Sequence, residues 1–355
     1  MNKARLIAIS SVVLLIAGCT ADDTLTPRKD TGQALVFDAT AEASDPTRGL
    51  VVKEADLQAK GFKLYANTVK NNVATPLMEG TAINYTGGSW TYAPIVYWPT
   101  EGKVDFFPVY TDDNATCIYG YDKRPHVTYT VPTDVSDQTD FLWAAPILNS
   151  DYKSEGFKFS FQHALASIAV EITSDYDGFA EALQDSTNFA GNIDPTISSV
   201  FATPAGETPA TLADFTDRQL VSVEITGKFP AKAEIDPKAT SIDKAWVFEY
   251  NDPSLYAERS YRLTSSMLNE TNETDNSATV KVAKSDPESY IFVLPSGTTN
   301  FNVKLTYKFK YKNLLYLYTL STTGNENFKA GKQVNLKSTV QCKKAPETLQ
   351  KVAIS

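Results

Sequence analysis

The sequence predicts an all-β protein made of β-sandwiches. Short runs rich in Val, Thr, Tyr and Phe recur along its 355 residues, and these residue types favour strands. Gly, Pro and Asn separate the runs, as in turns. Hardly any segment shows helical periodicity, and many short strands with regular turns are typical of sandwiches. The length is sufficient for two domains of ordinary size.

The expected strands of the first half are short and end at turn residues. Gly87-Gly88 predicts a hairpin turn, because such pairs adopt the positive φ angles of tight hairpins. Pro99 ends the apolar run before it, since proline cannot donate a hydrogen bond to a sheet. The expected strands are residues 33–39, 62–66, 89–92, 95–98, 104–110, 126–131 and 141–143.

Residues 157–172 carry two apolar patterns of opposite parity. The first set is Phe157, Phe159, Phe161 and His163, and the second is Ala166, Ile168, Val170 and Ile172. Successive side chains of a strand point to opposite faces, so the switch demands a bulge or a bend near residues 163–166. We expect one long strand that kinks there.

The second half resumes with strands after a polar stretch. A short helix is expected at about residues 179–183, close to the boundary between two domains at 49–180 and 181–355. Residues 301–311 alternate strictly between apolar and polar side chains, which predicts a strand with one buried face. The expected strands are 220–225, 245–248, 289–294, 301–311, 314–320, 334–340 and 349–354.

Residues 1–18 have the pattern of a signal peptide. Lys3 and Arg5 precede an apolar run that is too short to span a bilayer, and Ala17-Gly18 stands before Cys19. This pattern resembles the lipobox of bacterial lipoproteins, in which the cysteine is acylated and becomes the first residue. Acyl chains would then tether the protein to a membrane. A plain signal peptide with a chance cysteine is the alternative.

Residues 19–48 form a leader in front of the first expected domain. Its acidic start resembles the surface-export signal of lipoproteins in some Gram-negative anaerobes, so we expect an outer-membrane lipoprotein at the cell surface. The turn-rich stretch at 44–49 is a favourable site for proteolysis, with cleavage expected at Arg48-Gly49. Arg28 is the second choice.

Charge and motifs argue against several classes of function. The formal net charge is −9, and loss of Lys3 and Arg5 with the signal peptide makes it more negative. An acidic protein repels nucleic acid, so we expect no nucleic-acid partner. Two histidines and three cysteines, with none of the common zinc, phosphate-binding or nucleophile motifs, favour a protein that is not an enzyme. We expect no catalytic residue, metal or cofactor.

The remaining reactive and aromatic residues are interpreted as structural. Cys117 and Cys342 fall in different expected domains, which favours two free thiols over a disulfide. His163 is interpreted as a hydrogen-bonded residue at the kink rather than a ligand or base. The tryptophans lie in strand-like apolar runs and are expected in the core rather than on a sugar-binding surface: Trp90, Trp98, Trp143 and Trp246.

Several segments together resemble the fimbrillin-like (Mfa-like) family, the type V pilins and their relatives. They occur in the family's order: the lipobox, the leader ending at residues 47–49, residues 97–99 with 104–107, 140–144, 159–166, 291–295 and 328–332. The stretch around His163 is the most specific of them. The resemblance implies two β-sandwich domains with transthyretin-like topology.

The resemblance also implies an assembly mechanism. An arginine-specific protease removes the leader with its first strand, here the segment of Leu35, Val36 and Phe37. The vacated groove then accepts a strand from a neighbouring subunit, which satisfies its free backbone groups. The donated strand would be C-terminal, at residues 334–340 or 349–354, with the apolar side chains Val334, Leu336, Val340, Leu349, Val352 and Ile354.

The resemblance leaves three roles open. A stalk or tip subunit of a surface fimbria, with other pilin subunits as partners, is favoured by the leader strand and the C-terminal tail. A pilus anchor would keep its lipid and need no cleavage. A non-polymerising surface lipoprotein that binds a glycan or host ligand is the other alternative.

Overall fold

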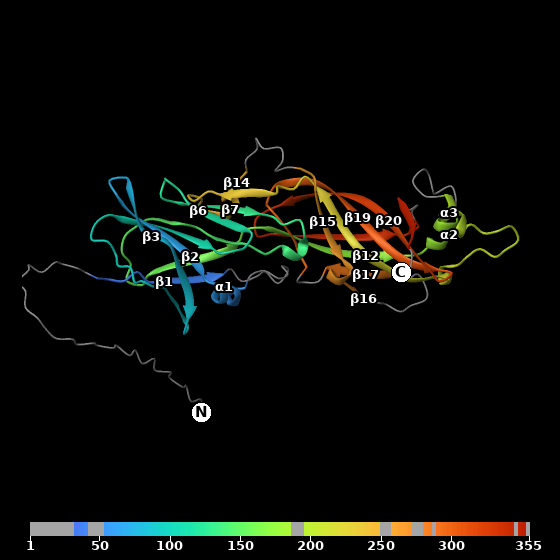
Figure 1. Ribbon diagram of the computed structural model, residues 1–355, viewed down its shortest axis with the longest axis horizontal. Coiled ribbons are helices and arrows are strands. Elements are labelled where there is room, and N and C mark those ends of the chain that lie inside the picture. The colour runs from blue at the N-terminus through green and yellow to red at the C-terminus, as the bar shows by residue number, and fades with distance from the viewer. Residues whose placement is uncertain are drawn as a thin grey trace, which may run out of the picture.

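The computed structural model describes residues 32–41, 53–185, 195–248, 257–271, 280–285, 289–343 and 347–352. Figure 1 shows an elongated molecule, with most of the earlier strands at one end and most of the later strands at the other. The expected all-β chain with sandwich packing is confirmed, because sheets pack face to face over buried aromatic and aliphatic side chains.

Three sheets build the N-terminal end. The first has the order β4 (Ser89–Thr91), β3 (Val73–Thr86), β2 (Phe62–Lys70), β5 (Lys103–Tyr110) and β9 (Ile147–Ser150). The second has the order β1 (Phe37–Ala41), β10 (Phe157–His163) and β8 (Leu142–Ala144). The third has the order β14 (Trp246–Val247), β13 (Lys232–Ile235), β7 (Pro125–Thr130) and β6 (Ala115–Tyr119).

Two sheets build the C-terminal end. One contains β16 (Leu268–Thr271), β17 (Val280–Ser285), β11 (Ala166–Asp175) and β18 (Ile291–Val293), with β21 (Gln333–Gln341) also paired to β11. The other has the order β15 (Arg259–Thr264), β12 (Phe215–Gly227), β19 (Gly297–Tyr311), β20 (Leu314–Phe328) and β22 (Thr348–Lys351).

The helices are short and lie outside the sheets. The α-helices are α1 (Glu54–Lys60), α2 (Phe179–Gln184) and α3 (Pro195–Phe201), and α2 confirms the helix expected at 179–183. Single 3₁₀ turns are η1 (Val135–Asp137), η3 (Leu212–Asp214), η4 (Ile242–Lys244) and η6 (Ser265–Met267).

The long hairpin β19–β20 follows directly from the sequence pattern. The apolar side chains of β19 are buried in strict alternation with exposed or half-buried polar ones, as expected for residues 301–311. Lys312 and Asn313 have φ of 49° and 61°, which is the geometry of a two-residue hairpin turn. The partner strand continues to Phe328, well beyond the expected residue 320.

The expected kink between β10 and β11 is confirmed as a bend at residues 164–165. Three separate segments satisfy the backbone there. The Ala164 amide donates to the Phe141 carbonyl at 2.8 Å, and the Gly331 amide donates to the Leu165 carbonyl at 2.8 Å. The Trp246 indole donates to the Ala164 carbonyl at 2.8 Å. Because of the bend, β10 belongs to a sheet at the N-terminal end of the molecule and β11 to a sheet at the C-terminal end.

A segment from the second half returns to the N-terminal end. β13 pairs antiparallel with β7, from Lys232 opposite Thr130 to Ile235 opposite Val127, and Figure 1 shows β14 beside β6 and β7. The β13–β7 pair thus joins residues from either side of the expected domain boundary at 180/181. Strand pairing alone does not define a domain boundary, so this division stays a prediction.

Some local expectations were wrong. Residues 95–98 form no strand and contribute one bridge, between Tyr97 and Ala34. Pro94 and Pro99 flank this segment, so donors for ladder hydrogen bonds are missing at both ends. The first expected strand is shifted, because regular pairing covers Phe37–Ala41 rather than residues 33–39.

Cys117 and Cys342 are free thiols, as favoured from the sequence. Trp143 is buried, and the other three tryptophans are half-buried against the core. Among the residues that the structure describes, no helix has the length and apolar character needed to cross a membrane.

Candidate functional site: the N-terminal strand and its slot

β1 is an edge strand that is buried on its inner face. Its inward side chains, together with Leu35 just before it, are at most 7% exposed: Leu35, Phe37, Ala39 and Ala41. Val36 points outward and is 54% exposed. Of the three residues expected in the removable strand, two therefore face the core and one faces solvent.

Backbone hydrogen bonds hold this segment on two sides. β1 runs parallel to β10, with Phe37 opposite Phe157 and Ala41 opposite Phe161. The Phe157 amide donates to the Val36 carbonyl at 2.9 Å. On the other side, the Leu35 amide donates to the Val96 carbonyl at 2.9 Å. We call the surface that receives residues 33–41 the β1 slot. It is formed by β10, residues 96–98 and the side chains of Trp90, Tyr92 and Phe106.

An aromatic pocket at the centre of the β1 slot receives the Phe37 ring. Its centroid lies 5.4 Å from that of Tyr92, 5.7 Å from that of Phe106 and 6.0 Å from that of Phe159. These distances are typical of favourable aromatic pairs. Ala39 and Ala41 are buried in the same row of side chains, so a larger side chain at either position would add volume to the core.

Two side chains donate hydrogen bonds to the backbone of the inserted segment. The Trp90 indole donates to the Ala39 carbonyl at 3.0 Å, and the Tyr92 hydroxyl donates to the Leu35 carbonyl at 2.8 Å. Burial raises the pKa of Tyr92, so its hydroxyl remains a neutral donor near neutral pH. Backbone carbonyls are common to every sequence, so these contacts recognise a strand in this position rather than particular side chains.

Gly156 allows β1 to approach closely. A Cβ at this position would lie 2.6 Å from the Val36 carbonyl oxygen, and the residue has a φ of +81°. Any other residue would therefore be strained and would also push against β1. The sequence alone gave no signal for Gly156, Trp90 or Tyr92 as parts of the site.

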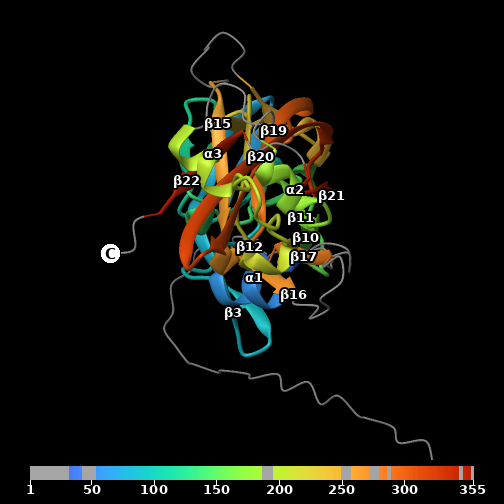
Figure 2. The ribbon, with the colours of Figure 1, turned by 90° about the vertical axis from the view of Figure 1, so that its right-hand side faces the viewer.

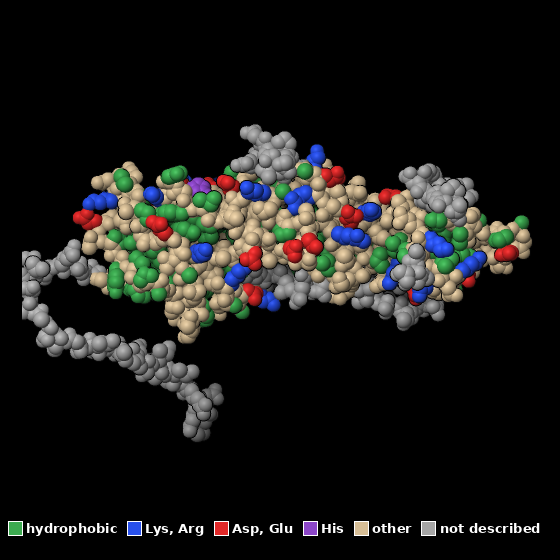
Figure 3. Space-filling model, viewed as in Figure 1, with side chains coloured by type: hydrophobic (Ala, Val, Ile, Leu, Met, Phe, Trp, Pro, Cys, Tyr) green, Lys and Arg blue, Asp and Glu red, His purple; other side chains and the backbone are tan. Residues whose placement is uncertain are grey.

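Hydrophobic side chains are exposed on the inserted segment and around the β1 slot. Val36, Ile95, Tyr97 and Tyr152 are between 38% and 54% exposed, and the Tyr152 ring packs 6.0 Å from that of Trp98. Figure 3 shows hydrophobic side chains gathered at the end of the molecule that holds β1 and β3. Exposed apolar surface of this kind is typical of interaction sites.

Several of the expected site residues lie outside the described residues. They are Cys19, Arg28, Arg48, Gly49 and Ile354. Their positions along the chain still matter, because Arg28 precedes β1 while Arg48 falls between β1 and α1. A cut at Arg48 would leave β1 held by non-covalent contacts alone, whereas a cut at Arg28 would leave it attached to the rest of the protein.

The two C-terminal donor candidates are edge strands of different sheets. β21 runs parallel to β11, from Gln333 opposite Ser167 to Gln341 opposite Asp175, and its apolar side chains Val334, Leu336 and Val340 are half-buried. β22 pairs antiparallel with β20 and buries Leu349, while Val352 follows it and donates to the Leu315 carbonyl. Figure 2 shows β21 and β22 on opposite sides of the C-terminal end.

His163 occupies a structural position at the end of β10. Its Nδ1 lies 2.7 Å from the Asp140 carboxylate, and both side chains are buried. The pair joins the strand before the kink to the segment leading into β8, in agreement with the interpretation of His163 as a hydrogen-bonded residue at the kink.

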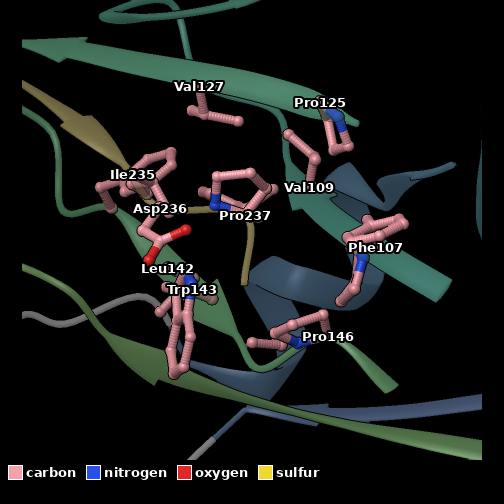
Figure 4. Close-up of a pocket in the computed structure, with 14 residues that line it drawn as sticks. Phe107, Val109, Pro125, Val127, Leu142, Trp143, Pro146, Ile235, Asp236 and Pro237 are labelled. Atoms are coloured by element: carbon pink, nitrogen blue, oxygen red, sulfur yellow. The ribbon is translucent and has the colours of Figure 1, made fainter. Parts of the chain in front are cut away.

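An apolar pocket between β5, β7, β8 and β13 is too small for an organic ligand. Figure 4 shows three prolines (Pro125, Pro146 and Pro237) around it, with Trp143 and Asp236 on its wall. Its volume is about 30 Å³, whereas ligand sites usually occupy several hundred Å³. Among the described residues, no group of three His, Cys, Asp or Glu side chains could hold a metal ion.

Comparison with known proteins identifies a family. The model of the fimbrillin-like family matches residues 51–355, which is most of the chain. A search among curated proteins finds no match.

Solved structures of low sequence identity also resemble the chain. A Bacteroides uniformis protein, provisionally assigned to cell adhesion, is 12% identical with a TM-score of 0.37, covering 92% of this chain and 99% of that one. A provisionally assigned adhesin from Bacteroides thetaiotaomicron is 9% identical with a TM-score of 0.38, covering 88% and 93%. The fimbrial anchor protein Mfa2 from Porphyromonas gingivalis is 9% identical with a TM-score of 0.30, covering 78% of each chain.

Proposed function

The chain belongs to the fimbrillin-like family, and we propose that it is a stalk or tip subunit of a surface fimbria that is assembled by replacement of β1. In this proposal, lipid on Cys19 carries the precursor to the outer membrane. Cleavage after Arg48 then separates the leader, and a strand of another pilin subunit takes the place of β1.

The observation that carries the proposal is the way β1 is held. It is an edge strand in parallel pairing with β10, and it reaches the rest of the molecule along the chain only through residues 42–53. One cut in that connection leaves the segment bound by hydrogen bonds and apolar contacts. Its loss would expose the aromatic pocket and the unpaired edge of β10 to water, which favours the addition of a new strand.

The parallel pairing of β21 with β11 supports the donor role of the C-terminus. β1 and β21 are parallel partners of the two halves of the same kinked strand. A C-terminal strand of this protein that binds beside the corresponding strand of a neighbouring pilin subunit would keep the type of pairing that it has in its own subunit. Head-to-tail donation of this kind does not close on itself and therefore builds a filament.

The proposal is tested by strand exchange after cleavage. The purified chain is treated with an arginine-specific protease, and a fluorescent peptide of residues 33–41 is added in excess. We expect the peptide to displace the native segment from the cleaved protein and to leave the uncleaved protein unlabelled. Arg48→Ala should abolish labelling, while Arg28→Ala should not, because only the former cut frees β1.

Two outcomes would overturn the proposal. One is a protein that resists cleavage between β1 and α1 while it remains folded. The other is a cleaved protein that never exchanges its segment with the peptide. Either result would favour a surface lipoprotein that binds a glycan or host ligand without polymerising, or a pilus anchor.

A further inference from the structure

We propose that the strand replacing β1 comes from a different chain, one that presents an aromatic side chain to the pocket of Phe37, and not from a second copy of this protein. The inference rests on the proposed replacement of β1 and names the partner that the β1 slot selects. It follows from the shape of the slot, the composition of the C-terminus and the charge beside the slot.

The shape of the β1 slot demands one large side chain with small ones after it. The pocket formed by Tyr92, Phe106 and Phe159 is filled by the Phe37 ring, which is 5% exposed. Two and four residues later, Ala39 and Ala41 are 2% and 7% exposed. Larger side chains there would overpack the site. A strand that fits the β1 slot therefore has an aromatic residue followed by small residues at alternate positions.

The two C-terminal donor candidates offer no aromatic side chain. The sequence from Lys329 to Ser355 contains no Phe, Tyr or Trp. If β21 entered the slot on its half-buried face, the pocket would receive Val334, Leu336, Ser338 or Val340, depending on register. The largest of these is leucine. With Leu336 in the pocket, Val340 would take the position of Ala41 and bring two more methyl groups into a position that is only 7% exposed.

The same comparison holds for the other donor candidate. β22 buries Leu349 and exposes Gln350 and Lys351, and the residues after it are no larger than isoleucine. Neither candidate can therefore restore the aromatic contacts that β1 makes. Because the lost contacts involve a buried ring, the mismatch weakens binding of either strand in the slot.

Charged side chains on the solvent-facing side of β1 and β10 also disfavour insertion of β21 into the β1 slot. Asp38 lies opposite Lys158 of β10, and the two charged groups are 3.9 Å apart. In the register that puts Leu336 in the pocket, Lys337 would take the position of Asp38 and meet Lys158. In its own subunit, Lys337 instead pairs with Glu171 at 3.1 Å. Like charges at adjacent positions repel, although exposure and salt limit the effect.

Peptide competition on the cleaved protein tests the inference. The fluorescent peptide of residues 33–41 is bound first, and unlabelled peptides compete for the slot. They are the peptide 33–41, the peptide 333–341, its Leu336→Phe variant and its Leu336→Phe/Lys337→Asp variant. The peptide 33–41 with Val36→Thr serves as the matched control, because this side chain faces solvent.

We expect the peptide 333–341 to compete at least about tenfold less well than 33–41, since it lacks a buried ring. Leu336→Phe should recover most of the difference, and Lys337→Asp should add a smaller gain that shrinks at high salt. The control should bind like 33–41.

The outcomes separate this inference from the proposed function. If 333–341 competes as well as 33–41, or if Leu336→Phe brings no gain, the selection of a different chain is refuted while strand replacement stands. If 33–41 itself never exchanges, strand replacement fails as well. The cleaved protein alone should also give no ladder of polymers on a gel, and a ladder would contradict the inference.

Discussion

Replacing Phe37 by alanine should loosen β1 far more than the rest of the molecule. The ring is buried against three other rings, and its removal leaves a cavity in the β1 slot. Phe-to-Ala changes at buried sites cost about 3–5 kcal/mol. We expect the lower end, about 3 kcal/mol, because an edge strand can shift to fill part of the cavity.

That cost should appear as local opening. If β1 can leave the sheet while the sandwich stays folded, a loss of about 3 kcal/mol raises its open population by roughly a hundredfold, at about 1.4 kcal/mol per factor of ten. Global unfolding then starts from a protein whose β1 has already opened. The free energy of unfolding should therefore fall by no more than the free energy that holds β1 in place.

Hydrogen exchange measured by mass spectrometry separates local opening of β1 from global unfolding. Exchange should accelerate in the peptide that covers residues 33–41, with a smaller change in peptides that cover β2 and β5. Urea unfolding gives the global value. Val36→Ala is the matched control on the same strand, since this side chain is 54% exposed and its loss should cost under about 0.5 kcal/mol.

The reasoning is refuted if, in Phe37→Ala, the peptides that cover β1, β2 and β5 all exchange with the same free energy of opening, equal to that of global unfolding. β1 would then be an inseparable part of the core. An effect as small as that of Val36→Ala would instead show that the aromatic pocket contributes little.

Two further changes probe the kink and the buried thiol. Asp140→Ala removes the hydrogen-bond partner of His163 Nδ1 at a buried position and should lower the free energy of unfolding by about 1–3 kcal/mol in urea titrations. Asp140→Asn keeps an acceptor oxygen and should cost less, and equal losses would contradict a role for the hydrogen bond. Burial raises the pKa of Cys342 to about 12, so little thiolate forms at pH 8 and this thiol should resist alkylation in the native protein. Mass spectrometry of the Cys342 peptide should show fast modification only in urea. Rapid labelling of Cys342 in the folded protein would contradict this expectation.

Strong local patterns were sufficient to predict many strands. The alternation in residues 301–311 specified both the strand and its buried face, because a slip of one residue would turn every apolar side chain to water. The change of parity at residues 163–166 located the kink for the same reason. In both cases the information lies in neighbouring residues.

Predictions failed where contacts distant in sequence decide the structure. β3 was not anticipated, because Pro76 and Gly80 interrupt it and two irregularities in its pairing with β2 disturb the alternation. The pairing of β13 with β7 joins residues about a hundred positions apart, and neither sequence contains a local signal for it. The site shows the same contrast. Its inserted segment was located approximately, but the slot residues Trp90, Tyr92 and Gly156 were not.

The topology explains why β1, rather than another edge strand, is suited to replacement. Hairpin strands such as β2 and β3 are joined by tight turns, so one chain cut leaves each attached at its other end. A parallel pair cannot be closed by a tight turn and needs a long connection. β1 pairs only with β10, more than a hundred residues away along the chain, and it is followed by a connection with an arginine at position 48. Separation of β1 and the residues just before it therefore requires the cleavage of one peptide bond and the loss of contacts with β10 and with residues 96–98. These are also the contacts that an incoming strand can restore.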